Sequence, residues 1–226
     1  MRLHEFELDE IARMPKRDFA GGKLTLQQRQ RQPEEPADTK PLPGGSKFTY
    51  NIQSRLGTDV INIYDPTSKV PWDSRAQIQL SNAEVDGIPE AVKVDMITVD
   101  EDYRGQGLAK ALYGIVLSVL HLPLVAGDSQ TPDGRRMWQM LHNTPGVEVQ
   151  GLWAVDKFQI TRPAAKALLA QPGMEIVGRG KFYTFVAFPI GPGKKELKSQ
   201  IHGLPVYHSE YDSVHNTMML ATWQGA

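Results

Sequence analysis

The stretch Ala91-Val92-Lys93-Val94-Asp95-Met96-Ile97-Thr98-Val99 is followed by Asp100-Glu101-Asp102-Tyr103-Arg104-Gly105-Gln106-Gly107-Leu108-Ala109 and by an apolar run over residues 111–120. The first part is rich in β-branched residues and predicts a strand, whereas the apolar run predicts a buried helix. The glycine-rich turn between them presents backbone N–H groups at the start of a helix, without side chains that block approach. The stretch therefore predicts a strand–turn–helix unit that suits a pyrophosphate.

Two common nucleotide-binding motifs do not fit this turn. The dinucleotide motif requires a third glycine where this sequence has Lys110. The phosphate-loop motif requires a glycine followed by Lys-Ser or Lys-Thr, and the sequence contains neither. Both classes of nucleotide site are therefore disfavoured.

The turn resembles the coenzyme A-binding signature of the GNAT acetyltransferase superfamily, Arg/Gln-x-x-Gly-x-Gly/Ala. Arg104, Gly107 and Ala109 fill this signature, and Val99 stands where the family places a valine at the end of the preceding strand. The resemblance spans about residues 90–142. It implies an α/β GNAT fold, with a mixed, mainly antiparallel sheet, splayed central parallel strands and flanking helices. In that family coenzyme A enters the gap between the splayed strands.

The same resemblance assigns the coenzyme A-binding residues. The pyrophosphate is expected on the turn residues Arg104, Gly105, Gln106, Gly107, Leu108 and Ala109. Backbone groups of Ile97, Thr98 and Val99 are expected to bond the pantetheine arm. The phrase Asp128-Ser129-Gln130-Thr131, with the helix that follows it, is also similar to GNAT-like proteins of tailed bacteriophages.

Acetyl transfer to an amine requires a base for the incoming ammonium group. Asp95 is the best-placed carboxylate, because it interrupts an apolar strand and, by the two-residue period, shares the pleat side of Ile97 and Val99. Burial raises the pKa of a carboxyl group towards the working pH. The alternative is that Asp95 is a paired or solvent-facing residue on a strand with one wet face.

The departing thiolate also needs a proton. Many GNAT members supply it from a tyrosine on the second helix, but Trp138 stands at that position and indole has no useful acidity. The candidates are Tyr183, which we place first, Tyr113 and Ser129. Otherwise water supplies the proton, or the protein performs no chemistry.

Composition excludes several other classes of protein. The 226 residues include 25 lysines and arginines against 26 aspartates and glutamates, so no global field favours nucleic acid. Without cysteine there is no disulfide, thiolate catalysis or cysteine-ligated zinc, and the spacing of His202, His208 and His215 fits no metal site. No signal-peptide core is visible, and the run 111–120 is too short to span a bilayer. We expect a cytoplasmic protein with no metal and no membrane partner.

The chain divides into three predicted parts. Residues 1–18 predict an amphipathic peptide, and a Pro/Gln-rich linker follows up to residue 46. The domain is expected over 47–190 and a C-terminal extension over 191–226. The first residues are similar in character to leader peptides of tailed-phage proteins destined for the capsid interior. That likeness implies a virion partner for residues 1–18, and host cytoplasm or virion as the location.

Hydrophobic periodicity predicts the remaining elements. Strands are expected over 47–55, 59–64, 75–80, 124–128, 147–155, 181–190 and 217–223, and further helices over 135–142 and 162–170. Strand, helix and strand around the glycine turn imply a right-handed crossover with a locally parallel pair.

The sequence thus predicts an N-acetyltransferase that moves an acetyl group from acetyl-CoA to a small-molecule or protein amine by direct attack. The alternative is a non-catalytic GNAT-like structural or binding protein of a phage.

Overall fold

The computed structural model describes residues 36–55, 57–83, 85–126, 132–191, 197–206 and 217–225. All of them belong to one unit of the chain, 35–226. The predicted peptide 1–18 and most of the predicted linker lie outside the described residues.

The first half of the sheet is an antiparallel meander. It consists of β2 (Thr49–Arg55), β3 (Thr58–Tyr64), β4 (Ser74–Asn82) and β5 (Val92–Val99). Buried and less buried residues alternate along β4, which gives the meander one apolar face. The four strands predicted here are therefore confirmed.

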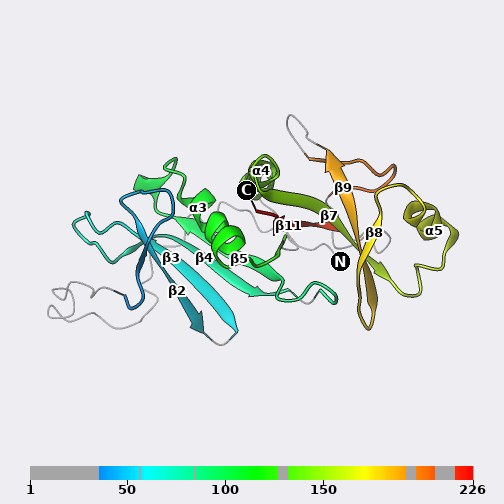
Figure 1. Cartoon of the computed structure of the whole chain (residues 1–226), viewed down its shortest axis with the longest axis horizontal. Helices are drawn as coiled ribbons and strands as arrows, with labels where there is room; N and C mark the ends of the chain where they lie inside the picture. Colours follow the sequence, from blue (N-terminus) through cyan, green and yellow to red (C-terminus); the bar gives the residue numbers. More distant parts are fainter. Residues whose placement is uncertain are drawn as a thin grey trace, which may run out of the picture. The chain divides into compact units, whose positions relative to one another are not determined.

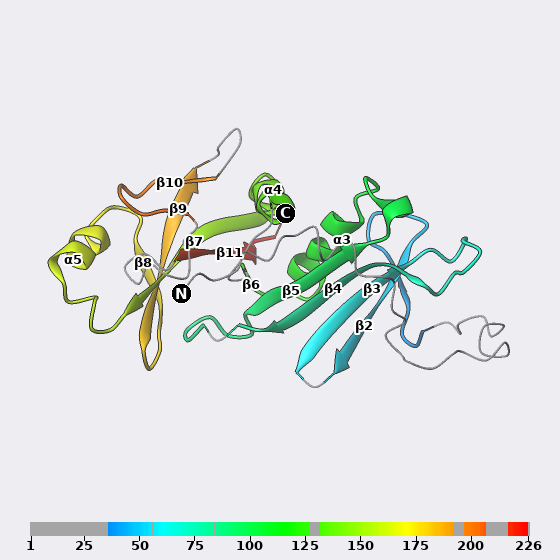
Figure 2. The ribbon, with the colours of Figure 1, turned by 180° about the vertical axis from the view of Figure 1, so that it is seen from behind.

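One helix covers that apolar face. After the short 3-10 turn η1 (Glu101–Tyr103), α3 (Leu108–Gly114) continues into the π-helical turn η2 (Ile115–Val119). The helix contacts β3, β4 and β5, as Figures 1 and 2 show from opposite sides. Its buried residues include Leu112 and Leu117, which join Ile61 and Ile78 in the main hydrophobic core.

The chain then returns to the sheet as β6 (Leu124–Val125), which pairs with β5 in parallel. This confirms the predicted parallel pair joined through a helix. On the other side of β6 lies β11 (Thr217–Trp223), followed by β7 (Val147–Asp156) and β9 (Tyr183–Gly191). Three short strands complete the sheet: β1 (Lys40–Pro41) pairs with β2, whereas β8 (Glu175–Arg179) and β10 (Lys198–Ser199) pair with β9.

Two more helices are described. The helix α4 (Pro132–His142) contacts β7 and β11, and α5 (Pro163–Leu169) lies between β7 and β8 in the chain (Figure 1). Both were predicted within a few residues. The described protein is thus an α/β fold with a large, mainly antiparallel mixed sheet.

The predicted domain boundaries need correction at both ends. Lys40–Pro41 forms β1 and Leu42 is buried, so the folded unit begins before residue 47. The segment 191–226 is not an appended extension, because β11 lies in the middle of the sheet and pairs with β6 and β7. Sequence periodicity identified β11 as a strand but carried no information about its neighbours.

A close contact fixes the packing of β7 on β9. Gly151 lies opposite Phe188, and a Cβ atom at residue 151 would stand 2.0 Å from the phenyl ring. Only glycine leaves room for this ring, which is fully buried. Among the described residues, no helix is long and apolar enough to cross a membrane.

Candidate coenzyme A site

The described pairing between the two central parallel strands is short. Among the described residues, β5 pairs with β6 only at Val92 with Leu124 and at Lys93 with Val125. Ala126 still donates its backbone N–H to Met219 of β11, at 2.8 Å. The end of β6 therefore stays with β11, while the rest of β5 extends without a described strand on that side.

Beyond Lys93, one side of β5 has no described strand beside it. Asp100 donates its N–H to the carbonyl oxygen of Arg75 at 2.8 Å, so its backbone faces β4. Bonded and non-bonded residues alternate along an antiparallel strand, so Thr98 also faces β4. The N–H and C=O groups of Ile97 and Val99 consequently point away from β4, towards the side where β6 has ended. Of the three residues predicted for the pantetheine arm, these two have the suitable direction.

A β-bulge interrupts β5 just before this segment. Gln79 of β4 lies opposite Met96, and the next residue, Leu80, lies opposite Val94. Asp95 is therefore the extra residue of the bulge. A bulge bends and twists its strand locally, and this one lies where β5 leaves β6.

The glycine turn joins the end of β5 to α3. Gly105 and Gly107 adopt φ angles of +78° and +79°, which are favourable only for glycine among common residues. A Cβ atom at either position would meet nothing within 4 Å, so the turn borders open space. Gly107 is the N-cap of α3, and the first helical N–H groups, beginning at Leu108, have no partner within the helix. The N–H groups of Arg104 and Gln106 already donate to the carbonyl oxygens of Glu101 and Tyr103, so the donors that remain for an anion are those of Gly105, Gly107 and the first residues of α3.

A buried carboxylate holds the residue that precedes the turn. The Asp65 side chain is 2% exposed and accepts hydrogen bonds from Lys47 Nζ at 2.5 Å and from the N–H and hydroxyl of Thr67. The Tyr103 hydroxyl donates to the same carboxylate at 3.2 Å. Burial by itself raises the pKa of Asp65, but these hydrogen bonds outweigh it and lower the pKa to about 2. Asp65 is therefore ionised at neutral pH.

The ring of Tyr103 is also held in place. Arg75 Cζ lies 5.2 Å and Lys47 Nζ lies 5.9 Å from the ring centroid, which are cation–π distances. Phe48 packs edge-on against the same ring, with centroids 6.1 Å apart. Because Tyr103 directly precedes Arg104, these contacts fix the start of the turn.

Comparison with known protein families, curated proteins and solved structures finds no significant match.

Asp95 does not lie where the strand period placed it. Because the bulge adds one residue, Val94, Ile97 and Val99 all pack against the main core, while Asp95 is exposed on the other face. Its carboxylate accepts a hydrogen bond from the Ser81 hydroxyl at 2.9 Å. The prediction that Asp95 shares a side with Ile97 and Val99 is wrong, and the burial expected for a catalytic base is not found.

The predicted proton donors do not meet Asp95 either. Tyr183 is 43% exposed at the start of β9, and four strand spacings from β5 to β9 amount to about 19 Å. Tyr113 is 5% exposed in α3, and burial raises its pKa to about 12. Trp138 is buried in the core, and Ser129 lies outside the described residues. The structure brings no predicted acid and base together.

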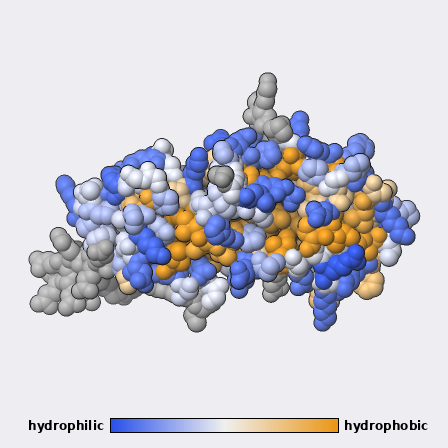
Figure 3. All heavy atoms as spheres, in the orientation of Figure 1, coloured by the Kyte–Doolittle hydropathy of each residue, from blue (hydrophilic) through white to orange (hydrophobic). Residues whose placement is uncertain are grey.

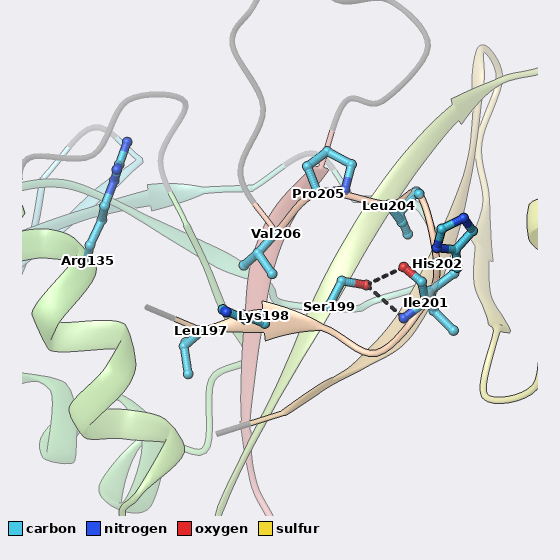
Figure 4. Close-up of a pocket in the computed structure, with 10 residues that line it drawn as sticks. Arg135, Leu197, Lys198, Ser199, Ile201, His202, Leu204, Pro205 and Val206 are labelled. Carbon is cyan, nitrogen blue, oxygen red and sulfur yellow. Dashed lines mark hydrogen bonds between the residues drawn. The ribbon is translucent and has the colours of Figure 1, made fainter. Parts of the chain in front are cut away.

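Two surface hollows lie away from the turn. One, of about 520 Å³, is lined by residues that include Asn82, Glu90 and Leu122. The larger, of about 670 Å³, has Arg135, Lys198 and His202 on its rim. Figure 4 shows these three side chains on separate parts of the rim, while Ser199 bonds the backbone of Ile201. Neither hollow includes a residue of the 104–107 turn, and the larger one gathers no convergent group.

Sequence reasoning missed the support of the turn. Asp65 is followed by Pro66 and Thr67, and its Oδ1 accepts the Thr67 N–H at 3.0 Å, as in an Asx turn. This local pattern could have identified Asp65 as a turn residue. Its contacts with Lys47 and Tyr103 join segments 18 and 38 residues away, which no local pattern reveals. Among the described residues, no cluster of three or more histidine, aspartate or glutamate side chains could hold a metal ion.

Proposed function

We propose that the protein binds acetyl-CoA beside β5 and transfers the acetyl group to an amine. The observation that carries this proposal is that the described pairing of β5 with β6 ends at Lys93, while β5 continues to Val99 and leads through η1 into an open glycine turn that starts a helix. A strand edge whose backbone groups have no partner among the described residues suits an extended amide-containing arm, and a helix start suits a pyrophosphate. The resemblance of the turn to the GNAT signature supports the same ligand.

In this proposal each part of acetyl-CoA meets a different backbone segment. N–H groups of Gly105 and of residues 107–109 bind the pyrophosphate. Arg104, whose side chain is 68% exposed and lies 3.9 Å from the Glu101 carboxylate, turns to the pyrophosphate and adds positive charge beside it. The N–H and C=O groups of Ile97 and Val99 bond the amides of the pantetheine arm. The arm then runs along β5 towards the bulge, which places the thioester near Asp95 and Met96.

The chemistry we propose is direct transfer. The neutral amine nitrogen attacks the thioester carbonyl carbon, the new C–N bond forms, and the C–S bond breaks. The amine loses one proton and the departing thiolate gains one, so the reaction is balanced without a metal. Because Asp95 is exposed and Tyr183 is distant, we assign both proton transfers to water in this proposal.

One observation favours a second function. The predicted base and acids lie apart from one another. A protein that only binds a ligand or assembles with a partner does not need them to converge. Such a protein would use the fold as a scaffold, and residues 1–18 would dock it to a partner such as a virion protein. The fold alone does not decide between the two functions.

The test is release of free thiol from acetyl-CoA in the presence of a panel of small amines and of lysine-containing peptides. An enzyme releases thiol in proportion to an acetylated amine that mass spectrometry identifies. Binding of acetyl-CoA without amine-dependent thiol release supports the scaffold. Absence of binding rejects both the coenzyme site and the transfer reaction.

A further inference from the structure

Large aromatic side chains are exposed together where β7 and β9 meet their connecting loops. Phe158 is 85% exposed, Phe182 63% and Tyr183 43%. Exposed side chains of this size are uncommon, since burying a phenyl group is strongly favourable. Three in one place indicate a surface that is covered by a partner.

These residues are neighbours in space. Asp156 of β7 lies opposite Tyr183 of β9, and the N–H of Lys157 donates to the carbonyl oxygen of Phe182 at 3.0 Å. The N–H of Gly180 donates to the carbonyl oxygen of Tyr183 at 2.8 Å, which leaves Lys181 and Phe182 as the two-residue turn between β8 and β9. We call Lys157, Phe158, Lys181, Phe182 and Tyr183 the aromatic tip.

The sequence of that turn is unusual. Two-residue hairpin turns favour glycine, asparagine and aspartate. Here Lys181 and Phe182 occupy the turn, and neither has a positive φ angle. A bulky apolar residue at a position where turn chemistry does not require it indicates a role in binding.

The chain segment that contains the aromatic tip carries a net positive charge. Residues 156–183 contain five lysines and arginines against two acidic residues, a net charge of +3, whereas the whole chain has a net charge of −1. Lys181 Nζ lies 5.1 Å from the centroid of the Phe182 ring. Two carboxylates border the tip: Asp156 accepts the N–H of Phe158 at 2.7 Å, and Asp86 lies against Gly180. The field of this region nevertheless favours an anionic partner.

We propose that the aromatic tip inserts into the headgroup region of an anionic membrane. Aromatic side chains beside lysines suit that boundary, where rings bury and ammonium groups contact lipid phosphates. The Tyr183 ring lies beside that of Phe185, with centroids 6.4 Å apart and planes tilted by 50°, which is not the flat stacking platform that single-stranded nucleic acid requires. A bilayer surrounds a protruding tip from all sides and needs no such platform.

The surface view agrees with this composition. At the lower right of Figure 3, below the positions of β8 and β9 in Figure 1, hydrophobic and strongly hydrophilic surface adjoin. Neither of the two surface hollows contains a residue of the aromatic tip. This contact is peripheral and requires no membrane-spanning helix.

The test is flotation of the full chain with vesicles of phosphatidylcholine, alone or with phosphatidylglycerol. We expect binding only to the anionic vesicles, weakened by salt. Each of Phe158→Ser and Phe182→Ser is expected to lower partitioning onto vesicles about tenfold, because each removes one phenyl group that the bilayer would otherwise bury. Lys157→Gln combined with Lys181→Gln should remove the preference for anionic lipid. All four side chains are exposed, so these changes leave the fold intact.

A matched control lies elsewhere on the surface. Lys69 and Val70 are likewise an exposed lysine next to an exposed apolar residue in the sequence, with Val70 40% exposed. The pair Lys69→Gln with Val70→Ser should not change vesicle binding. The proposal is overturned if the wild type does not bind anionic vesicles, or if both phenylalanine variants bind as well as the wild type. Binding of a fluorescent single-stranded oligonucleotide that the same variants abolish, without vesicle binding, would assign the tip to nucleic acid instead.

Discussion

Replacing the buried carboxylate of Asp65 tests the support beneath the glycine turn. The change Asp65→Asn keeps the size of the side chain and removes its charge, while Lys47, Thr67 and Tyr103 remain in place. Its effect on stability follows from the difference between the pKa of Asp65 in the folded protein, about 2, and the ordinary value of 3.8. That difference corresponds to a contribution on the order of 2 kcal/mol to the free energy of unfolding at neutral pH.

The sign of the pH dependence follows from the lowered pKa. The folded state binds a proton less readily than the unfolded state, so the contribution is complete above the unfolded pKa of 3.8 and disappears as the pH falls towards 2. At about pH 3 roughly half of it remains. The wild type and Asp65→Asn should therefore differ most at pH 7 and become similar at low pH.

Urea unfolding followed by tryptophan fluorescence measures this difference, and buried Trp153 provides a suitable reporter. The control is Asp133→Asn, because the ion pair of Asp133 with Arg136 is exposed and should contribute little. An unchanged free energy of unfolding in Asp65→Asn at pH 7 would refute the reasoning. A loss of the same size at pH 7 and pH 3 would refute the assignment of the effect to charge.

Other predictions test packing, ionisation and chemistry. Gly151→Ala should lower the free energy of unfolding by about 1–3 kcal/mol, since its methyl group meets the ring of Phe188. Gly114→Ala should raise the free energy of unfolding by up to about 1 kcal/mol in the same urea assay, because Gly114 lies in a helix and an added Cβ atom would meet nothing within 4 Å. Burial raises the pKa of Tyr113 to about 12, so its phenol should ionise only near pH 12. The difference between the ultraviolet pH titrations of the wild type and of Tyr113→Phe isolates the absorbance of this tyrosinate. Tyr183→Phe should leave thiol release unchanged if the proton of the leaving group comes from water, and a large loss of rate would restore Tyr183 as the acid.

Local sequence patterns predicted where the helices and strands lie better than they predicted which strands pair with one another. Alternation along residues 75–80 predicted β4, and the apolar run over 111–120 predicted the helix that α3 and η2 form, but not its π-helical turn. The short strand β8 was missed, since five residues interrupted by Gly178 give little periodic signal. The position of β11 between β6 and β7 depends on pairing between distant segments, which a local pattern does not contain.

The candidate site shows the same division. The turn at 104–107 was visible because glycine at positive φ leaves a direct trace in the sequence. The bulge at Asp95 was not visible, because the two-residue period assumes a regular strand and one extra residue reverses every later side chain. A single inserted residue thus moved the predicted base to the wrong face of β5.

Calorimetric titration of three proteins with acetyl-CoA tests whether the turn at 104–107 binds this ligand. Gly107→Glu places a negative side chain in the turn, and Gly57→Glu makes the same change in the hairpin between β2 and β3. The two glycines are matched, with φ angles of +79° and +80° and nothing within 4 Å of an added Cβ atom, so both variants carry the same left-handed strain of about 1–2 kcal/mol. We predict that the wild type and Gly57→Glu bind acetyl-CoA and that Gly107→Glu does not. Absence of binding by the wild type, or equal binding by both variants, would contradict the account.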